Sequence, residues 1–386
     1  MNIKNINKFI KIIDRITKNK SKSLHEPNFC GKEIKLLKKS IIGKSVSTYG
    51  EETNKFEKKI QTVTKAKHVV SVINGTSALQ LALYSAGVNK NCEVLIPALN
   101  YVASTNATMY VNGTPHFIDV EENSLGVDFK KLDIYLNKIS IKKNKKCFNK
   151  KTKKIIKAIV VTHVFGHPCN LEMAKKICKK YNLILIEDAA EALGSYYKKK
   201  HLGTFGSVGI LSFNGNKIIT TGGGGAVLTN NSEIARKINH ISRNSRVKKH
   251  FWDYSHDELG FNFRLPSLNA NLGIAQMKNL NYFLRNKRRL FERYKKLFSN
   301  FNEFKLLKEP KNAKSNYWLN TIILKKANKK TILKIVKLSA KKKIQLRPVW
   351  RILSRNKYLN KFPRMNLDCA NNLEKRIINI PSSSDL

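Results

Sequence analysis

Short apolar runs alternate with segments of helical periodicity along most of the chain, and this alternation predicts the fold. The expected strands cover residues 69–73, 94–97, 116–119, 155–162, 183–187, 208–213 and 226–229. Helical patterns lie between several of them, at 77–85, 104–111 and 171–181. Apolar strands of this length alternating with helices indicate a mostly parallel sheet covered on both faces. The expected class is therefore α/β.

The two ends of the chain predict smaller elements. The pattern of residues 1–23 predicts an amphipathic helix that packs on its own domain or on a partner subunit. Its apolar stripe consists of Ile3, Ile6, Phe9, Ile10, Ile13 and Ile16. A long helical pattern at about 268–297 leads into a smaller α+β domain with strand-like segments at 321–325 and 344–347. We therefore expect a helical extension (1–23), a large domain (24–265) and a small domain (266–386).

Charged residues are distributed unevenly along the chain. They make up 26% of its 386 residues, yet segments 69–89 and 94–118 contain no Asp, Glu, Lys or Arg. Segment 202–232 contains one charged residue, Lys217. Because charged side chains are almost never fully buried unless paired, these segments should form the central sheet and the helix starts on it. The lysine-rich segment 142–154 is expected to be an exposed loop.

The formal net charge of +48 would suit a nucleic-acid-binding protein. However, only 14 of the 74 basic residues are arginine, the residue preferred for bidentate contacts to phosphates and bases. The lysines are also spread along almost the whole chain. This pattern favours solvated lysine-rich faces, and no nucleic-acid partner is expected.

Other features bear on the compartment and on metal binding. No apolar run approaches the roughly 20 residues that span a bilayer, and the N-terminal segment lacks the apolar core of a secretory signal. The cysteines show no CxxC spacing, so neither a metal site nor a disulfide framework is expected. They are Cys30, Cys92, Cys147, Cys169, Cys178 and Cys369. A reducing, cytoplasmic location without membrane contact is the simplest expectation.

Lys217 is the first candidate for chemistry. It stands in SFNGNKIITTGGGG, between an apolar strand and the glycine run 222–225. Burial of a lysine disfavours its ammonium form, and a partly neutral lysine is what Schiff-base chemistry requires. The alternative is a lysine whose stem is buried while its ammonium group reaches solvent. The local pattern does not decide between these two interpretations of Lys217.

Two further segments carry polar groups suited to a ligand. Asp188, in IEDAAEALGS, ends an apolar strand, where ligands bind in open α/β sheets. Its carboxylate can hold a proton on a pyridine nitrogen, or it can cap a helix that follows. The segment GTSALQLAL, from Gly75, offers backbone amides and hydroxyls to a phosphate, although Thr and Ser also cap helices without a ligand.

The order of these segments matches fold-type-I enzymes that use pyridoxal 5′-phosphate (PLP). From about residue 24 onward the chain resembles the DegT/StrS-type sugar aminotransferases. The matching segments are STYGEETNKFEKK, NGTSALQLAL, VLIPALNYVAST, PHFIDVEENSLGVD, VTHVFGHPCNLE, IEDAAEALGS, SFNGNKIITTGGGGAVL, GFNFRLPSLNANLGIAQ and RPVW. The segments LHEP, CFNKKTKK and RPVW resemble the branch that makes 4-amino sugars for legionaminic-acid or bacillosamine pathways.

The resemblance implies specific roles within a large PLP-binding domain. Lys217 would bind PLP through a Schiff base and move a proton between the cofactor and the sugar carbon. Asp188 would pair with the pyridine nitrogen. Further contacts are implied for Glu191 at the ring hydroxyl, Tyr101 on the ring face, Thr76, Ser77 and Ser212 at the phosphate, Asn262 at the phosphate of the neighbouring subunit, His163 in the pocket wall, and Arg347 and Trp350 at the substrate.

One residue departs from the family pattern. The family often has His just before the lysine, where this chain has Asn214, so the contacts around the phosphate and substrate are left open. A related group of sugar dehydratases has His at the position of the lysine itself. Lys217 therefore favours amino transfer over dehydration.

The resemblance implies a homodimeric transaminase with shared active sites. L-glutamate would donate the amino group to a nucleotide-linked 4-keto-6-deoxyhexose carrying an acetamido group at C2. The product would be a 4-amino sugar for surface-glycan biosynthesis. Two alternatives stay open: a 3-keto-sugar aminotransferase on the same scaffold, and a non-catalytic nucleic-acid-binding regulator that has kept the fold.

Overall fold

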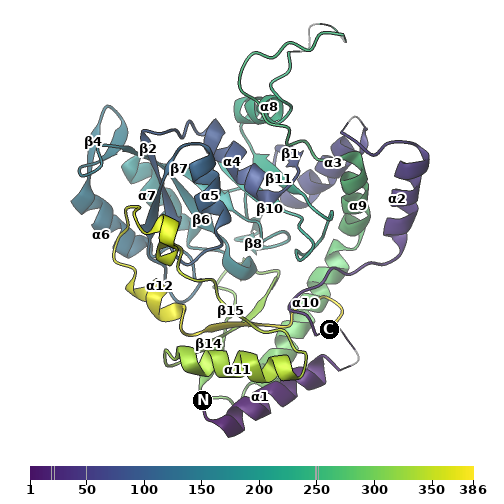
Figure 1. The fold of residues 1–386 in the computed structure, drawn as a ribbon, viewed down its shortest axis with the longest axis vertical. Coiled ribbons are helices and arrows are strands. Elements are labelled where there is room, and N and C mark those ends of the chain that lie inside the picture. The colour runs from purple at the N-terminus through teal and green to yellow at the C-terminus, as the bar shows by residue number, and fades with distance from the viewer. Residues whose placement is uncertain (19, 21, 49, 248–249, 251) are drawn as a thin grey trace.

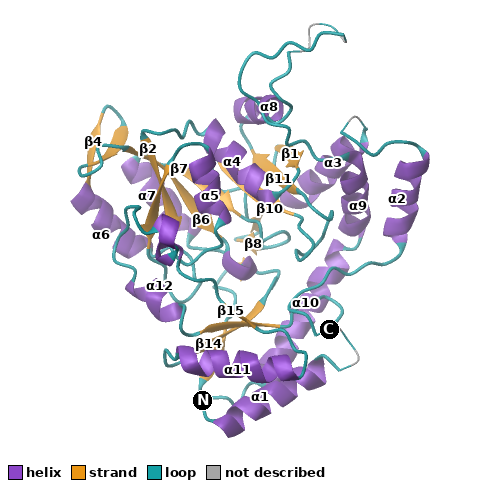
Figure 2. Ribbon diagram, in the orientation of Figure 1, coloured by secondary structure: helices purple, strands orange, loops and turns teal. Residues whose placement is uncertain are grey.

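The computed structural model describes residues 1–386 except 19, 21, 49, 248–249 and 251. Within this range, the larger part of the molecule is built on a nine-stranded sheet with helices packed around it (Figures 1 and 2). The strand order is β1-β11-β10-β7-β6-β2-β3, and the hairpin β4-β5 joins β6. These strands are β1 (His68–Val72), β2 (Cys92–Pro97), β3 (Thr114–Ile118), β4 (Ser140–Lys143), β5 (Lys146–Asn149), β6 (Ile155–Thr162), β7 (Ile184–Asp188), β10 (Val208–Ser212) and β11 (Gly225–Thr229).

Strand direction determines where a ligand can bind. The pairs β10–β7, β7–β6, β6–β2 and β2–β3 are parallel. Strand β11 is antiparallel to both β10 and β1, so β1 runs in the same direction as β10. The carboxyl ends of β1, β10, β7, β6 and β2 therefore meet at one edge of the sheet, which is where open α/β sheets bind ligands. The mostly parallel α/β fold expected from the sequence is confirmed.

The helices of this larger part begin where side chains can cap them. Asn74 accepts a hydrogen bond from the backbone N–H of Ser77 at the start of α4, and Asn170 does the same for Met173 at the start of α7. The helices are α2 (Lys32–Ile42), α3 (Glu52–Thr64), α4 (Gly75–Ser85), α5 (Ala103–Tyr110), α6 (Phe129–Ile139), α7 (Leu171–Tyr181), α8 (Ser232–Ile241) and α9 (Ser267–Lys278).

The smaller part of the molecule contains an antiparallel sheet of order β12-β14-β16-β15. Its elements are α10 (Leu280–Leu297), β12 (Phe304–Leu306), β14 (Asn320–Leu324), α11 (Lys329–Lys341), β15 (Arg347–Pro348), α12 (Asp368–Leu373) and β16 (Ile377–Ile380). Helix α1 (Ile3–Ile16) lies beside α11 and joins the same hydrophobic core (Figure 1). The N-terminal helix thus packs on the C-terminal part of its own chain. The two parts are called the larger and the smaller domain, and the boundaries expected for them stay predictions.

Phe9 anchors α1 in this core, and its replacement by alanine should be costly. The ring is fully buried and stacks on Phe298 at a centroid distance of 5.3 Å. We expect Phe9→Ala to lower the free energy of unfolding by about 3–5 kcal/mol, because truncation of a buried aromatic ring leaves a cavity. Denaturant unfolding would measure the change. Replacement of the exposed Lys11 on the same helix is the control, and an equal loss for Lys11→Ala would contradict the packing role.

Three expectations about individual elements need correction. One helix is expected at 268–297, but the structure has two, α9 and α10. The helical backbone is interrupted at Asn279, whose φ is −103° and ψ is 1°. The lysine-rich segment 142–154 is not simply a loop, since much of it forms the β4–β5 hairpin, with Cys147 turned inward. The strand expected at 344–347 is limited to Arg347–Pro348, because the N–H of Gln345 bonds to Lys22 outside the sheet.

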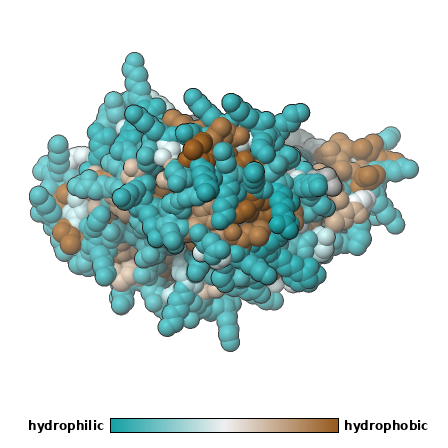
Figure 3. Space-filling model, turned by 90° about the horizontal axis from the view of Figure 1, so that it is seen from below, coloured by the Kyte–Doolittle hydropathy of each residue, from teal (hydrophilic) through white to brown (hydrophobic). Residues whose placement is uncertain are grey.

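Polar side chains cover most of the surface in the view from below, and apolar atoms gather in limited patches (Figure 3). Among the residues that the structure describes, no helix is long and apolar enough to cross a bilayer. The polar surface agrees with the interpretation that the many lysines lie on solvated faces.

Candidate active site

A cavity of about 380 Å³ opens at the carboxyl edge of the large sheet. The larger domain supplies the start of α4 and the segments that follow β2, β7 and β10, and the smaller domain supplies two tryptophans and an arginine. The polar and aromatic lining residues are Asn74, Thr76, Asn100, Tyr101, Thr162, Asp188, Glu191, Ser212, Asn214, Asn216, Lys217, Trp318, Arg347 and Trp350. The cavity therefore collects most of the residues that the sequence singled out.

The segment that carries Lys217 is held in place by hydrogen bonds. The backbone N–H of Lys217 donates to the carbonyl of Asn214 at 2.9 Å, and the indole N–H of Trp318 donates to the carbonyl of Asn216 at 2.7 Å. The amine Nζ lies 3.5 Å from Glu191 Oε1 and 3.9 Å from the centroid of the Trp318 ring. With 14% of its side chain exposed, Lys217 directs its amine into the cavity and not outward to solvent.

Glycines bring the surrounding segments unusually close together. A Cβ atom on Gly75 would lie 3.0 Å from Cβ of Ser212, and one on Gly225 would lie 2.5 Å from the carbonyl of Asn74. The start of α4, the end of β10 and the start of β11 therefore pack without room for side chains. Their approach places the hydroxyls of Thr76 and Ser212 together with a helix N-terminus, an arrangement that attracts phosphate.

Asp188 ends β7 and is buried at the cavity. Its carboxylate accepts hydrogen bonds from the hydroxyl of Ser104 at 3.1 Å and the backbone N–H of Ala190 at 3.2 Å. Burial raises the pKa of Asp188, and these two bonds and the charge of Lys217 oppose that rise. Residues 189–194 form turns and no helix, so a helix-capping role for Asp188 is ruled out.

Glu191 is the second buried carboxylate at the cavity. Burial raises its pKa to about 7, although the charge of Lys217 lowers it. Its Oε2 accepts a hydrogen bond from the backbone N–H of Phe165 at 2.8 Å, and Phe165 has the left-handed φ of 55°. Glu191 therefore links Lys217 to the strained turn at Phe165. The ring of Phe165 packs against that of Trp350 at a centroid distance of 5.1 Å.

The raised pKa of Glu191 predicts a pH-dependent stability. Between 4.5, its ordinary value, and about 7, the folded chain binds more protons than the unfolded chain, so this carboxyl makes folding less favourable as the pH rises. We expect Glu191→Gln to raise the free energy of unfolding of the apoprotein by about 1–3 kcal/mol at pH 8, with little gain at pH 4.5. Denaturant unfolding at both pH values would measure this.

Glu172→Gln is the matched control for that experiment. Glu172 is an exposed glutamate paired with Lys198, and the hydrogen bond from Lys198 lowers its pKa. Its replacement should give no gain at pH 8. A gain for Glu191→Gln that does not change with pH would contradict the assignment.

Some expected site residues lie away from the cavity wall. Ser77 is buried within α4, where its N–H bonds to Asn74. His163 lies behind Asp188, and its Nε2 is 2.9 Å from Oε2 of Glu187, so its ring supports the strand end instead of lining the cavity. Asn262 is exposed on a separate hollow together with Arg243 and other polar residues. Its expected contact with a neighbouring subunit stays a prediction.

Other lining residues were not singled out from the sequence. Asn100 donates to the hydroxyls of Ser104 and Thr162, and Ser104 in turn bonds to Asp188. Asn100 and Ser104 flank Tyr101 in a segment without charged residues. That absence of charge could have identified both residues as site candidates from the sequence. Trp318 had no such signal, because it lies about one hundred residues from Lys217 in the other domain.

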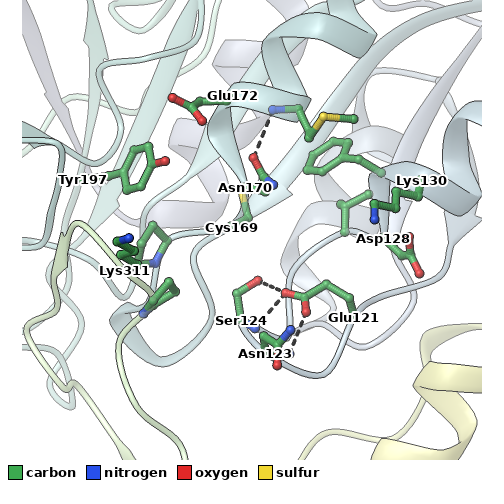
Figure 4. Close-up of a pocket in the computed structure, with 15 residues that line it drawn as sticks. Glu121, Asn123, Ser124, Asp128, Lys130, Cys169, Asn170, Glu172, Tyr197 and Lys311 are labelled. Atoms are coloured by element: carbon green, nitrogen blue, oxygen red, sulfur yellow. Dashed lines mark hydrogen bonds between the residues drawn. The ribbon is translucent and has the colours of Figure 1, made fainter.

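A larger cavity, of about 530 Å³, lies near the starts of α6 and α7 (Figure 4). Its acidic groups already have partners within the described chain: Glu121 bonds to Ser124, Asp128 caps α6, and Glu172 pairs with Lys198. Neither Lys217 nor Asp188 lines it. The smaller cavity is therefore the candidate active site.

Comparisons with known proteins show to which family the chain belongs. The model of the DegT/DnrJ/EryC1/StrS aminotransferase family matches residues 29–386. GDP-perosamine synthase from Escherichia coli O157:H7 is 33% identical over 366 residues, which are 94% of this chain and 93% of the relative. A Campylobacter jejuni UDP-4-amino-4,6-dideoxy-N-acetyl-beta-L-altrosamine transaminase is 34% identical over 290 residues, 75% of this chain and 72% of that protein.

A solved structure extends the likeness to the fold. Helicobacter pylori PseC, an aminotransferase involved in the biosynthesis of pseudoaminic acid, matches with a TM-score of 0.85 and 25% identity over 94% of each chain. The fold-type-I architecture and the sugar aminotransferase resemblance are thereby confirmed. The chain belongs to the DegT/DnrJ/EryC1/StrS aminotransferase family, and it is a PLP-dependent sugar aminotransferase.

Proposed function

We propose that this enzyme transfers the amino group of L-glutamate to C4 of a nucleotide-linked 4-keto-6-deoxyhexose carrying an acetamido group at C2. The single observation that carries the site assignment is that Lys217 Nζ, the buried carboxylate of Asp188 and the start of α4 face one cavity. The name of the Campylobacter relative describes a 4-amino-4,6-dideoxy sugar, which supports amination at C4. The reaction exchanges a keto oxygen for an amino group and leaves 2-oxoglutarate.

The residues of the cavity fit PLP in their chemistry. A carboxylate held by Ser104 and Ala190 suits a protonated pyridine nitrogen. Hydroxyls beside a helix N-terminus suit the phosphate, and the close approach at Gly75 is what such a cradle requires. An amine between these groups can attach the cofactor covalently. When bound, PLP supplies the electron sink that stabilises negative charge at the reacting carbon.

Each residue of this chain then has a defined task. Lys217 attaches the cofactor and, once released, moves a proton at its Nζ. Asp188 keeps the proton on the ring nitrogen. Glu191 lies 3.5 Å from the amine of Lys217 and accepts the backbone N–H of Phe165, so it can position the lysine side chain. The remaining assignments are Thr76 and Ser212 at the phosphate, Tyr101 on the ring, His163 behind the strand end, Arg347 and Trp350 at the sugar nucleotide, and Asn262 at the site of a second subunit in a homodimer.

The experiment that tests the proposal follows the cofactor by its visible spectrum. Purified enzyme with PLP is treated with L-glutamate, and the change to the amino form of the cofactor is recorded. UDP- and GDP-linked 4-keto-6-deoxyhexoses, with and without the acetamido group, are then added separately, together with a 3-keto isomer. We expect reversal of the spectral change with the 4-keto-2-acetamido substrate. NMR of the product would show the new amine at C4.

Two results would overturn the proposal. A colourless protein that gains no absorbance with PLP would rule out the chemistry altogether. Turnover of the 3-keto isomer with an amine at C3 would place the enzyme on the alternative substrate.

A further inference from the structure

His25 lies close to the site and has no polar partner. Both nitrogens of its ring are shielded from solvent, and neither has a hydrogen-bond partner among the residues that the structure describes. Buried polar atoms in native proteins are nearly always hydrogen-bonded, so an unpartnered pair beside a candidate site suggests that the bound ligand supplies the partner. The residue belongs to the segment LHEP, for which the site described above provides no role.

The position of His25 relates it to the reacting lysine. Its ring centroid lies 6.5 Å from that of Trp318, and the same Trp318 ring has Lys217 Nζ 3.9 Å from its centroid. Burial lowers the pKa of His25, and the positive charges of Lys287 and Lys217 lower it further. The imidazole is therefore neutral at physiological pH.

The backbone on both sides of His25 is fixed. The carbonyl of Leu24 accepts from the N–H of Ser382 at 2.8 Å, and the N–H of Glu26 donates to the hydroxyl of Ser383 at 2.9 Å. The N–H of Leu24 also donates to the side chain of Gln345 at 3.3 Å. Hydrogen bonds on both sides of His25 hold the segment against the smaller domain, so the imidazole ring is preorganised beside the active-site cavity.

The side of the active-site cavity near His25 is not the side that is proposed to hold PLP. Asp188, Thr76 and Ser212 come from the larger domain, whereas Trp318 and Arg347 come from the smaller one. Leu24, next to His25, lines a groove that also includes Arg347, and Arg347 lines the active-site cavity as well. His25 thus lies on the side proposed for the sugar nucleotide.

We propose that His25 determines substrate specificity by hydrogen-bonding a neutral polar group of the acceptor sugar, a hydroxyl or the acetamido group. This inference rests on the proposed function. A neutral imidazole offers one donor and one acceptor, which match a hydroxyl or an amide. The carboxylates of glutamate would be better bound by a cation. Amino transfer has two half-reactions, one with glutamate and one with the acceptor sugar. His25 therefore acts in the half-reaction with the sugar and not in the one with glutamate.

The two halves can be measured separately, because each changes the spectrum of the bound cofactor. We expect His25→Ala to lower kcat/KM for the sugar half-reaction by about tenfold, the scale of one lost hydrogen bond, and to leave the glutamate half-reaction within about twofold. His25→Asn should recover part of the loss, since an amide keeps a donor and an acceptor. His25→Phe, which keeps a ring but no polar atom, should not.

His167 provides a matched control. It is the other histidine whose two ring nitrogens are both shielded and unpartnered within the described chain, and its ring packs against Tyr317 at 5.3 Å. The charges that act on it come from Glu309 and Arg288 and not from Lys217. His167→Ala is compared at equal folded concentration, and the ratio of kcat/KM for its two half-reactions should match that of the wild type.

The outcomes separate this inference from the proposed function. Equal slowing of both half-reactions in His25→Ala, slowing of the glutamate half alone, or no slowing would each overturn the role of His25. Failure of the wild-type enzyme to accept any 4-keto sugar nucleotide would overturn the proposed function instead.

Discussion

Replacement of Lys217 by alanine is expected to lower the rate of amino transfer by about 10⁴- to 10⁶-fold, the range found when a covalent catalytic group is removed. The amine that faces the cavity is lost, and with it both the covalent attachment of PLP and the group proposed to move the proton. The protein should still bind PLP through its other contacts. Single-turnover kinetics and the visible spectrum of the purified variant would measure both effects.

Two controls make this result specific to the amine. Lys217→Arg places a guanidinium group near Glu191 but cannot form the covalent link, so it should be as inactive as the alanine variant. Lys198→Ala removes an exposed lysine and should retain full activity. Borohydride reduction of the wild-type enzyme with PLP, followed by peptide mapping, should find the modification on Lys217. Its appearance on another lysine would refute the assignment.

Asp188→Asn is expected to lower kcat by about 10²- to 10³-fold, the cost of losing one preorganised electrostatic contact at a reacting group. The amide oxygen of asparagine can accept from the N–H of Ala190 while its NH2 group donates to the hydroxyl of Ser104, so the site should stay folded. It cannot stabilise a positive charge on the pyridine nitrogen, so the electron sink is weakened. Steady-state kinetics at saturating substrate would measure the loss.

Ser104→Ala is the companion variant. It removes one hydrogen bond to Asp188 but leaves the carboxylate in place, so a loss of only a few fold is expected. If Asp188→Asn kept a kcat within tenfold of the wild type while Ser104→Ala lost more, the carboxylate would not be the important group.

The central sheet could be predicted because its strands are buried runs bounded by polar turns. Strand β6 and helix α7 begin and end where the pattern of residues indicated. The break at Asn279 could not be predicted, because asparagine is tolerated within helices and the apolar pattern continues on both sides of it. The β4–β5 hairpin was hidden by lysines, which are common on exposed edge strands.

The site was predictable to the extent that its chemistry is local in the sequence. Lys217 and Asp188 each lie in a segment with a recognisable pattern, and the structure directs both into one cavity. The placement of Trp318 against Lys217 depends on how the two domains pack, which no local pattern specifies. Similarly, the position of His163 is explained by Glu187, which also accepts backbone N–H groups from Gly203 and Gly206.

The packing of α1 has a consequence for how the chain is made. Helix α1 is synthesised well before its core partners, which lie between Leu290 and Ile380. At typical synthesis rates the apolar stripe of α1 waits on the order of 15–60 s before residue 290 is added. During that time the larger sheet can fold, whereas the smaller domain cannot close its core. The core of this domain can therefore close only after residues near 380 have been added, because it combines segments that lie far apart in the sequence.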